Sequence, residues 1–376
     1  MHKSTLISFS LLLISISSVT AGKRLVCYFG SWAVYREGAN AFNISSIPVN
    51  LCTHVIYSFL GLSFDGTIEV LDTYTDEELE GFKKVLALKT LNKNLKVMIA
   101  VGGGSFDPGT FSWIVSDNDT INTTVNSLAE FLTVYPFDGI DLDWEFPSSD
   151  EDKANFAIFA AALKKRLIKM KPRRILTAAV TADPETAILG YDMKKLVKSL
   201  DWVHVMTYDY HYYDDGVTGY NAPLKGGVND TSIYASVAYW KKNGLPGAKL
   251  VLGIPLYAKT FTLEDPTQHD LGAYVTGPGT AGPITLEDGA LDYMEVCYFL
   301  KKTGWTSVNS TFYQSTYAYK GDQWISYESL DNYIAKVKYA KTMGGAMVWN
   351  LAGDDYAGRY CNNGKYPILT LLKKYI

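Results

Sequence analysis

Eight short runs of apolar and β-branched residues recur along the chain, and they constrain its fold more than any other feature. They are continuously apolar rather than alternating, as is typical of strands that are buried on both faces. Helix-like stretches separate most of them, and those at 76–91 and 152–170 have apolar residues at spacings of three and four. Eight strands with intervening helices predict an α/β fold, a (β/α)8 TIM barrel. The runs span residues 24–30, 53–61, 95–102, 139–145, 175–181, 202–208, 249–257 and 345–350.

The interval between the seventh and eighth runs is much longer than the others. Its first part, residues 259–327, is rich in Gly, Pro, Thr and Tyr, and residues 313–327 predict an antiparallel hairpin with a Lys-Gly-Asp turn. We therefore expect a small α+β insertion domain at 259–327 and a barrel formed by 22–258 and 328–376. Loops that follow barrel strands rise from the catalytic face, so the insertion would wall one side of a site there.

The first 21 residues predict a secretory signal peptide. A single Lys precedes a short apolar run, and the small residues Val19 and Ala21 suit cleavage after Ala21. The alternative is an N-terminal anchor. We expect a secreted, extracellular protein, and five Asn-x-Ser/Thr sequons agree with that route. They lie at Asn43, Asn118, Asn122, Asn229 and Asn309.

The four cysteines are Cys27, Cys52, Cys297 and Cys361, which allow three pairings. No CxxC pair occurs, and none of the five histidines stands at ligand spacing, so we expect no metal site. In an oxidising compartment, two disulfides are the simpler interpretation.

Charge and motif content exclude several function classes. A formal net charge of −4 gives no indication of nucleic acid or an anionic membrane as partner. No second apolar stretch reaches membrane length. The Gly-rich run at 102–104 lacks the spacing of a dinucleotide fingerprint, and no GxSxG motif occurs. We expect a monomer that uses no cofactor.

Three carboxylates stand at alternate positions of the fourth run. Asp141, Asp143 and Glu145 would all point into the barrel, because side chains alternate faces along a strand. Their mutual repulsion and burial must push the pKa values apart, which allows one acid to stay protonated near neutral pH. Glu145, nearest the mouth, would be the general acid. With no second carboxylate evident for double displacement, an N-acetyl sugar could supply its own nucleophile, oriented by Asp143, while Asp141 shares a proton with Asp143.

The segment DGIDLDWEFP at 138–147 resembles the active-site strand of family-eighteen glycoside hydrolases, the chitinases and chitinase-like proteins. The resemblance extends over the whole mature chain, with KVMIAVGGG at 96–104, VMTYDYH at 205–211 and GGAMVWNLAGDD at 344–355. It implies a chitinase insertion domain after the seventh strand. It also implies an endochitinase that binds chitin or chito-oligosaccharides and cuts β-1,4-linked N-acetylglucosamine with retention.

The resemblance also assigns residues to roles. Asp141, Asp143 and Glu145 would be the catalytic set, with Tyr208 as hydrogen-bond donor to the acetamido carbonyl. Asp209 would hold a sugar hydroxyl, and Trp349 would form the floor of the site. The disulfides would be Cys27–Cys52 and Cys297–Cys361. Pocket-lining positions would be Tyr28, Phe59, Met206, Tyr257 and Met347. We also assign Trp32 to the cleft, with a surface-cover role as its alternative.

The sequence departs from the family pattern around the groove. Gly104 stands where the family usually has Trp, Asp214 replaces another Trp, and Lys259 replaces an Arg. We expect weaker stacking along the cleft, partly restored by Tyr212 or Tyr213 unless both are surface residues. His54 and His204 are interpreted as core histidines. The alternative function is a chitinase-like lectin or growth-factor-type protein with little turnover, but Glu145 favours an enzyme.

Overall fold

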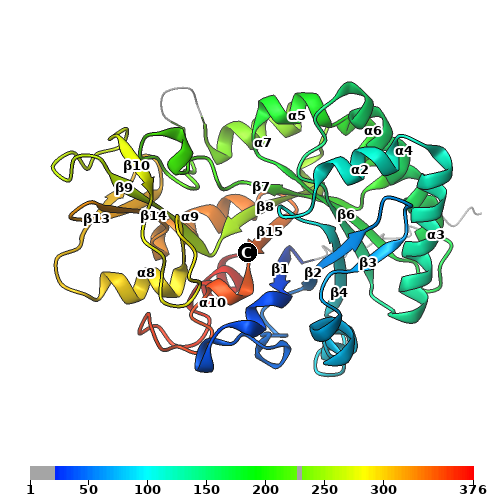
Figure 1. Cartoon of the computed structure of the whole chain (residues 1–376), viewed down its shortest axis with the longest axis horizontal. Coiled ribbons are helices and arrows are strands. Elements are labelled where there is room, and N and C mark those ends of the chain that lie inside the picture. The colour runs from blue at the N-terminus through cyan, green and yellow to red at the C-terminus, as the bar shows by residue number, and fades with distance from the viewer. Residues whose placement is uncertain (1–21, 227–230) are drawn as a thin grey trace, which may run out of the picture.

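The computed structural model describes residues 22–226 and 231–376, and its centre is a closed barrel of eight parallel strands. Each strand pairs with its neighbours, and β1 pairs with both β2 and β15, which closes the barrel. The TIM-barrel prediction is therefore confirmed (Figure 1). The predicted signal peptide and the sequon at Asn229 lie outside the described residues. The barrel strands are β1 (Arg24–Gly30), β2 (His54–Leu62), β4 (Lys96–Gly102), β5 (Gly139–Asp143), β6 (Ile175–Thr181), β7 (Trp202–Met206), β8 (Leu250–Pro255) and β15 (Gly345–Trp349).

Helices cover the outside of the barrel (Figure 1). The helix expected at 152–170 is α4, which begins after Ser149, whose hydroxyl accepts from Asp152 N. No helix within 22–226 and 231–376 is long and apolar enough to cross a membrane. The helices are α1 (Gly81–Ala87), α2 (Pro108–Val115), α3 (Asn118–Val134), α4 (Asp150–Leu167), α5 (Pro184–Gly190), α6 (Met193–Ser199), α7 (Ile233–Lys242), α8 (Tyr293–Leu300), α9 (Leu330–Ala340) and α10 (Pro367–Tyr375).

The single helix expected at 76–91 is wrong, because the segment folds as three short pieces. A π-helical turn, Tyr74–Glu78, is followed by α1 and a 3-10 turn, Leu88–Thr90. Glu80 interrupts the helix with a left-handed backbone at φ 56°. The next residue, Gly81, packs so closely that a Cβ there would lie 2.6 Å from Thr75 O. Tertiary packing thus overrides the helical periodicity.

A second, antiparallel sheet lies to one side of the barrel, between β8 and β15 in sequence (Figure 1). The expected hairpin is confirmed, with Lys320 paired to Gln323 across the turn. The first strand of the antiparallel sheet begins at Tyr257, two residues before the predicted start of the insertion domain. The bounds of that domain stay a prediction. The strands are β9 (Tyr257–Leu263), β10 (Val275–Pro278), β11 (Ala290–Asp292), β12 (Thr306–Ser310), β13 (Ser315–Lys320) and β14 (Gln323–Tyr327), while β3 (Ile68–Val70) extends the barrel sheet beside β2.

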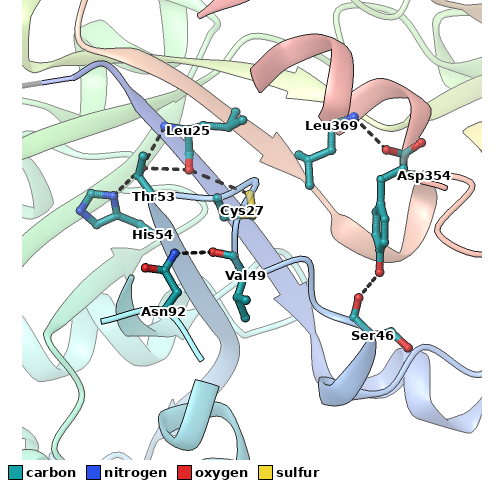
Figure 2. Close-up of a disulfide and its surroundings, with 11 residues drawn as sticks. Leu25, Cys27, Ser46, Val49, Thr53, His54, Asn92, Asp354 and Leu369 are labelled. Carbon is teal, nitrogen blue, oxygen red and sulfur yellow. Dashed lines mark hydrogen bonds between the residues drawn. A yellow bond between two sulfur atoms is a disulfide. The ribbon is translucent and has the colours of Figure 1, made fainter. Parts of the chain in front are cut away.

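Both disulfides that the resemblance implied are present, Cys27–Cys52 and Cys297–Cys361. The first joins β1 to the segment before β2, and Figure 2 shows its surroundings. There the Thr53 hydroxyl accepts from Leu25 N and donates to Leu25 O, both at 3.0 Å. These contacts tie the second strand to the first at the amino-terminal end of the barrel.

Candidate active site

A cleft of about 1270 Å³ opens at the carboxyl ends of the barrel strands. Loops after several strands contribute to it, as expected for the catalytic face of this fold. Every pocket position expected from the sequence lines the cleft, including Trp32, whereas Asp141 lies buried beneath it. The expected residues that line it are Tyr28, Trp32, Phe59, Asp143, Glu145, Met206, Tyr208, Asp209, Tyr257, Met347 and Trp349.

The three carboxylates, here called the carboxylate column, run from the barrel interior to the cleft. Asp141 is fully buried, Asp143 is 3% exposed, and Glu145 is partly exposed in the cleft. The strand ends at Asp143 rather than at Glu145, so the last carboxylate stands on the loop that follows β5. The three carboxyl groups therefore differ in how deeply they are buried in the barrel, although their chemistry is the same.

Asp141, at the base of the column, is held by donors from three other strands. Its Oδ2 accepts from the Tyr28 hydroxyl on β1. Its Oδ1 accepts from Thr177 Oγ1 on β6 at 2.5 Å and lies 3.2 Å from His204 Nδ1 on β7. A carboxylate can satisfy three donors, whereas a carboxylic acid would have to turn its own proton toward one of them. This set differs from the expectation that Asp141 shares a proton with Asp143.

His204 is the functional-site residue that sequence reasoning missed. It is fully buried, as the core interpretation required, but its ring contacts Asp141, Tyr28 and Trp202. A signal was present in the sequence. Trp202, His204 and Met206 stand at alternate positions of one barrel strand, so His204 shares a face with a residue already assigned to the pocket.

Burial and repulsion raise the pKa values of the two upper carboxyls. The pKa of Asp143 lies well above its usual range because of burial, with the charges of Glu145 and Asp141 adding to it. Burial, followed by the charge of Asp209, raises the pKa of Glu145 to about 7. Asp143 Oδ1 is also buried without a hydrogen-bond partner in the described part of the chain. Glu145 is therefore protonated below about pH 7 and can donate a proton into the cleft.

Polar groups from the loop that follows β7 and from β9 form a wall beside the column. The Tyr208 hydroxyl lies 4.0 Å from the Met347 sulfur, and burial raises the pKa of Tyr208 well above its usual range. Asp209 Oδ1 accepts from the Tyr257 hydroxyl at 2.5 Å and lies 3.1 Å from Lys259 Nζ. Lys259 thus keeps an ion pair at the position where the family usually has Arg.

Aromatic rings form the opposite wall. Trp349 lies at their centre, 5.5 Å from the Tyr28 ring, 5.8 Å from Phe59 and 6.0 Å from Trp32, measured between ring centroids. Trp32 stacks on Phe59 with an interplanar angle of 13° and remains 44% exposed. Such ring faces suit the apolar faces of pyranose sugars.

The altered positions differ in what they do to the cleft. A Cβ at Gly104 would lie 3.3 Å from Glu145 Oε1, so the glycine lies directly beside the acid and places no side chain against it. Tyr212 lines the cleft and is 43% exposed. Tyr213 instead packs against the antiparallel sheet beside Gly289, where a Cβ would lie 2.9 Å from its ring. Of the two tyrosines, only Tyr212 is placed to meet a ligand.

Comparison with known proteins gives one consistent result. Residues 24–354 match the family model of glycosyl hydrolases family 18. Chitotriosidase-1 of Mus musculus is 37% identical over 93% of this chain and 77% of its own length. The structure of Ostrinia furnacalis Group IV chitinase, also solved with allosamidin, superimposes with a TM-score of 0.91 at 34% identity, covering 94% of this chain and 99% of that one. The structure of human YKL-39, described as a pseudo-chitinase with retained chitooligosaccharide binding, superimposes with a TM-score of 0.88 at 33% identity. It covers 94% of this chain and 99% of that one.

Proposed function

Because this chain belongs to glycosyl hydrolase family 18, we propose that it is a secreted endochitinase that hydrolyses β-1,4-linked N-acetylglucosamine chains. The observation that carries the proposal is the carboxylate column, in which an acid with a pKa of about 7 stands in the cleft above two more deeply buried carboxyls. Secretion is proposed from the signal-peptide pattern at 1–21 and the sequons.

The proposed reaction is retaining and assisted by the substrate. Glu145 protonates the glycosidic oxygen, and the acetamido carbonyl of the sugar attacks the anomeric carbon as the bond breaks. The cyclic oxazolinium ion that results is positively charged, and the Asp143 carboxyl accepts from its N–H and can ionise as that charge develops beside it. Tyr208 donates to the acetamido oxygen. Deprotonated Glu145 then removes a proton from water, which opens the ring from the opposite face.

The second candidate is a lectin that binds chito-oligosaccharides with little turnover. The observations that favour it are the absence of an aromatic side chain at Gly104 and the structural similarity to YKL-39. Against it stands the complete carboxylate column, because a lectin has no need of an acid poised near pH 7.

Turnover separates the two candidates. The mature protein is incubated with chitotetraose, and the products are separated by length. We expect net hydrolysis to shorter chito-oligosaccharides. Binding of chitotetraose with no product formed would support the lectin and contradict the enzyme.

Tyr212 provides a further prediction, about the groove. We expect Tyr212→Ala to raise the dissociation constant for chitotetraose by roughly 5- to 100-fold, as for the loss of one stacking platform. The matched control is Tyr274→Ala, which removes a 71% exposed tyrosine directly before β10, outside the cleft. Calorimetric titration measures both. Equal affinity in wild type and both variants would mean that Tyr212 is only a surface residue.

A further inference from the structure

His204, which contacts Asp141 at the base of the carboxylate column, belongs to a chain of directional hydrogen bonds. Trp202 Nε1 donates to His204 Nε2 at 2.7 Å, and His204 Nδ1 lies 3.0 Å from the Tyr28 hydroxyl and 3.2 Å from Asp141 Oδ1. The chain crosses from β7 to β1 and β5 inside the barrel. Each link restricts where the protons of His204 can be.

The hydrogen bond from Trp202 determines the protonation state of one ring nitrogen of His204. An indole N–H can only donate, so His204 Nε2 must be the bare, accepting nitrogen. Neutral imidazole carries one proton, which is then on Nδ1.

The Tyr28 link gives the same answer independently. The Tyr28 hydroxyl donates its single proton to Asp141 Oδ2, so the Tyr28 oxygen can only accept from His204 Nδ1. Asp141 Oδ1 is an acceptor as well. Both neighbours of Nδ1 therefore require a proton on it.

A second proton on His204 is opposed by its surroundings. Protonated Nε2 would point at the indole N–H and break the 2.7 Å bond. The titratable groups that face the ring are Asp141, Tyr28 and His54, and burial lowers the pKa of His54 to about 3. On the far side of the donor, the Arg24 guanidinium lies over the Trp202 ring, 4.4 Å from its centroid. Of these groups, only Asp141 favours a charged imidazole, and Asp141 already accepts a hydrogen bond from the protonated Nδ1 of the neutral ring.

We propose that Trp202 locks His204 as the neutral Nδ1–H tautomer, which makes His204 a positioning residue that keeps Asp141 a fully paired carboxylate. The charge of Asp141 adds to the rise in the pKa of Asp143 directly above it. The lock therefore retains the exchangeable proton at the upper end of the column, on Asp143 and Glu145. A cationic His204 would neutralise Asp141 and release that proton more easily.

Long-range ¹H–¹⁵N NMR of the labelled full mature protein tests the lock without reference to turnover, so it stands apart from the proposed function. We expect the His204 signals, assigned with His204→Gln, to show bare Nε2 and protonated Nδ1 throughout about pH 5 to 8. A protonated Nε2, or a His204 that titrates in that range, would overturn the proposal.

Trp202→Phe keeps an aromatic ring at this buried position but removes the indole N–H together with the volume of the second ring. We expect His204 to begin to titrate in this variant, and the kcat profile on chitotetraose to gain an acid limb at the same pH, with KM unchanged because the cleft wall is intact. The control is Trp324→Phe, which makes the same change on β14 of the antiparallel sheet, outside the cleft, and loses a similar bond, Nε1 to His269 O at 2.9 Å. His204 signals that match wild type in Trp202→Phe would reduce Trp202 to a packing role and refute the lock.

Discussion

Glu145→Gln is expected to reduce kcat on chitotetraose by at least about 10²-fold, the low end for loss of a general acid. Glutamine keeps the shape and hydrogen-bonding capacity of the side chain but has no proton to give to the glycosidic oxygen. Since the aromatic wall is untouched, we expect the dissociation constant for chitotetraose to stay close to that of wild type. Single-turnover kinetics and calorimetry of the same preparation measure the two quantities.

The control for this variant is Glu151→Gln, the same chemical change at an exposed position on α4 outside the cleft. It should behave as wild type in both assays. Turnover by Glu145→Gln at the wild-type rate would remove Glu145 from the role of acid, and a parallel loss of binding would indicate a role in holding the substrate instead.

Asp143→Asn is expected to lower kcat by about 10²-fold or more, since an amide, unlike a carboxyl, cannot take on negative charge beside the developing oxazolinium ion. Asparagine has nearly the same shape, and Asp143 Oδ1 has no hydrogen-bond partner to lose in the described part of the chain. The fold should therefore survive, with thermal unfolding as the check. A thiazoline analogue of the cyclic intermediate should bind the variant more weakly than wild type, because asparagine cannot ionise beside the ring of the analogue.

Asp117→Asn is the matched control for Asp143→Asn. Asp117 caps α3 outside the cleft, and asparagine is an equally good N-cap, so stability and kcat should both be retained. If Asp143→Asn kept the wild-type kcat, charge stabilisation by Asp143 would have to be abandoned.

The parts of this structure that the sequence predicts are those encoded by neighbouring residues. The barrel strands follow from apolar runs that are each contiguous, and the hairpin follows from the turn at Gly321 between Lys320 and Gln323. The proposed catalytic carboxylates could be named because they stand at alternate positions of β5 and the loop that directly follows it. In each case, local pattern and tertiary position agree.

The parts that the sequence does not predict depend on contacts between distant residues. The partners of Asp141 come from three other strands, and only closure of the barrel brings Tyr28 and His204 together. The choice between Tyr212 and Tyr213 depends on distant contacts too, because the Tyr213 ring packs beside Gly289 whereas Tyr212 lines the cleft. The missed break at Glu80 has the same origin, a close contact of Gly81 with a neighbouring turn.

An NMR time course of chitotetraose hydrolysis tests the central claim most directly, since it records turnover and stereochemistry together. Attack by the acetamido group and then by water inverts the anomeric carbon twice, so we predict that the new reducing end first appears as the β-anomer and only later equilibrates. Initial release of the α-anomer would contradict the substrate-assisted mechanism, and no release of either anomer would contradict the assignment of this protein as a chitinase.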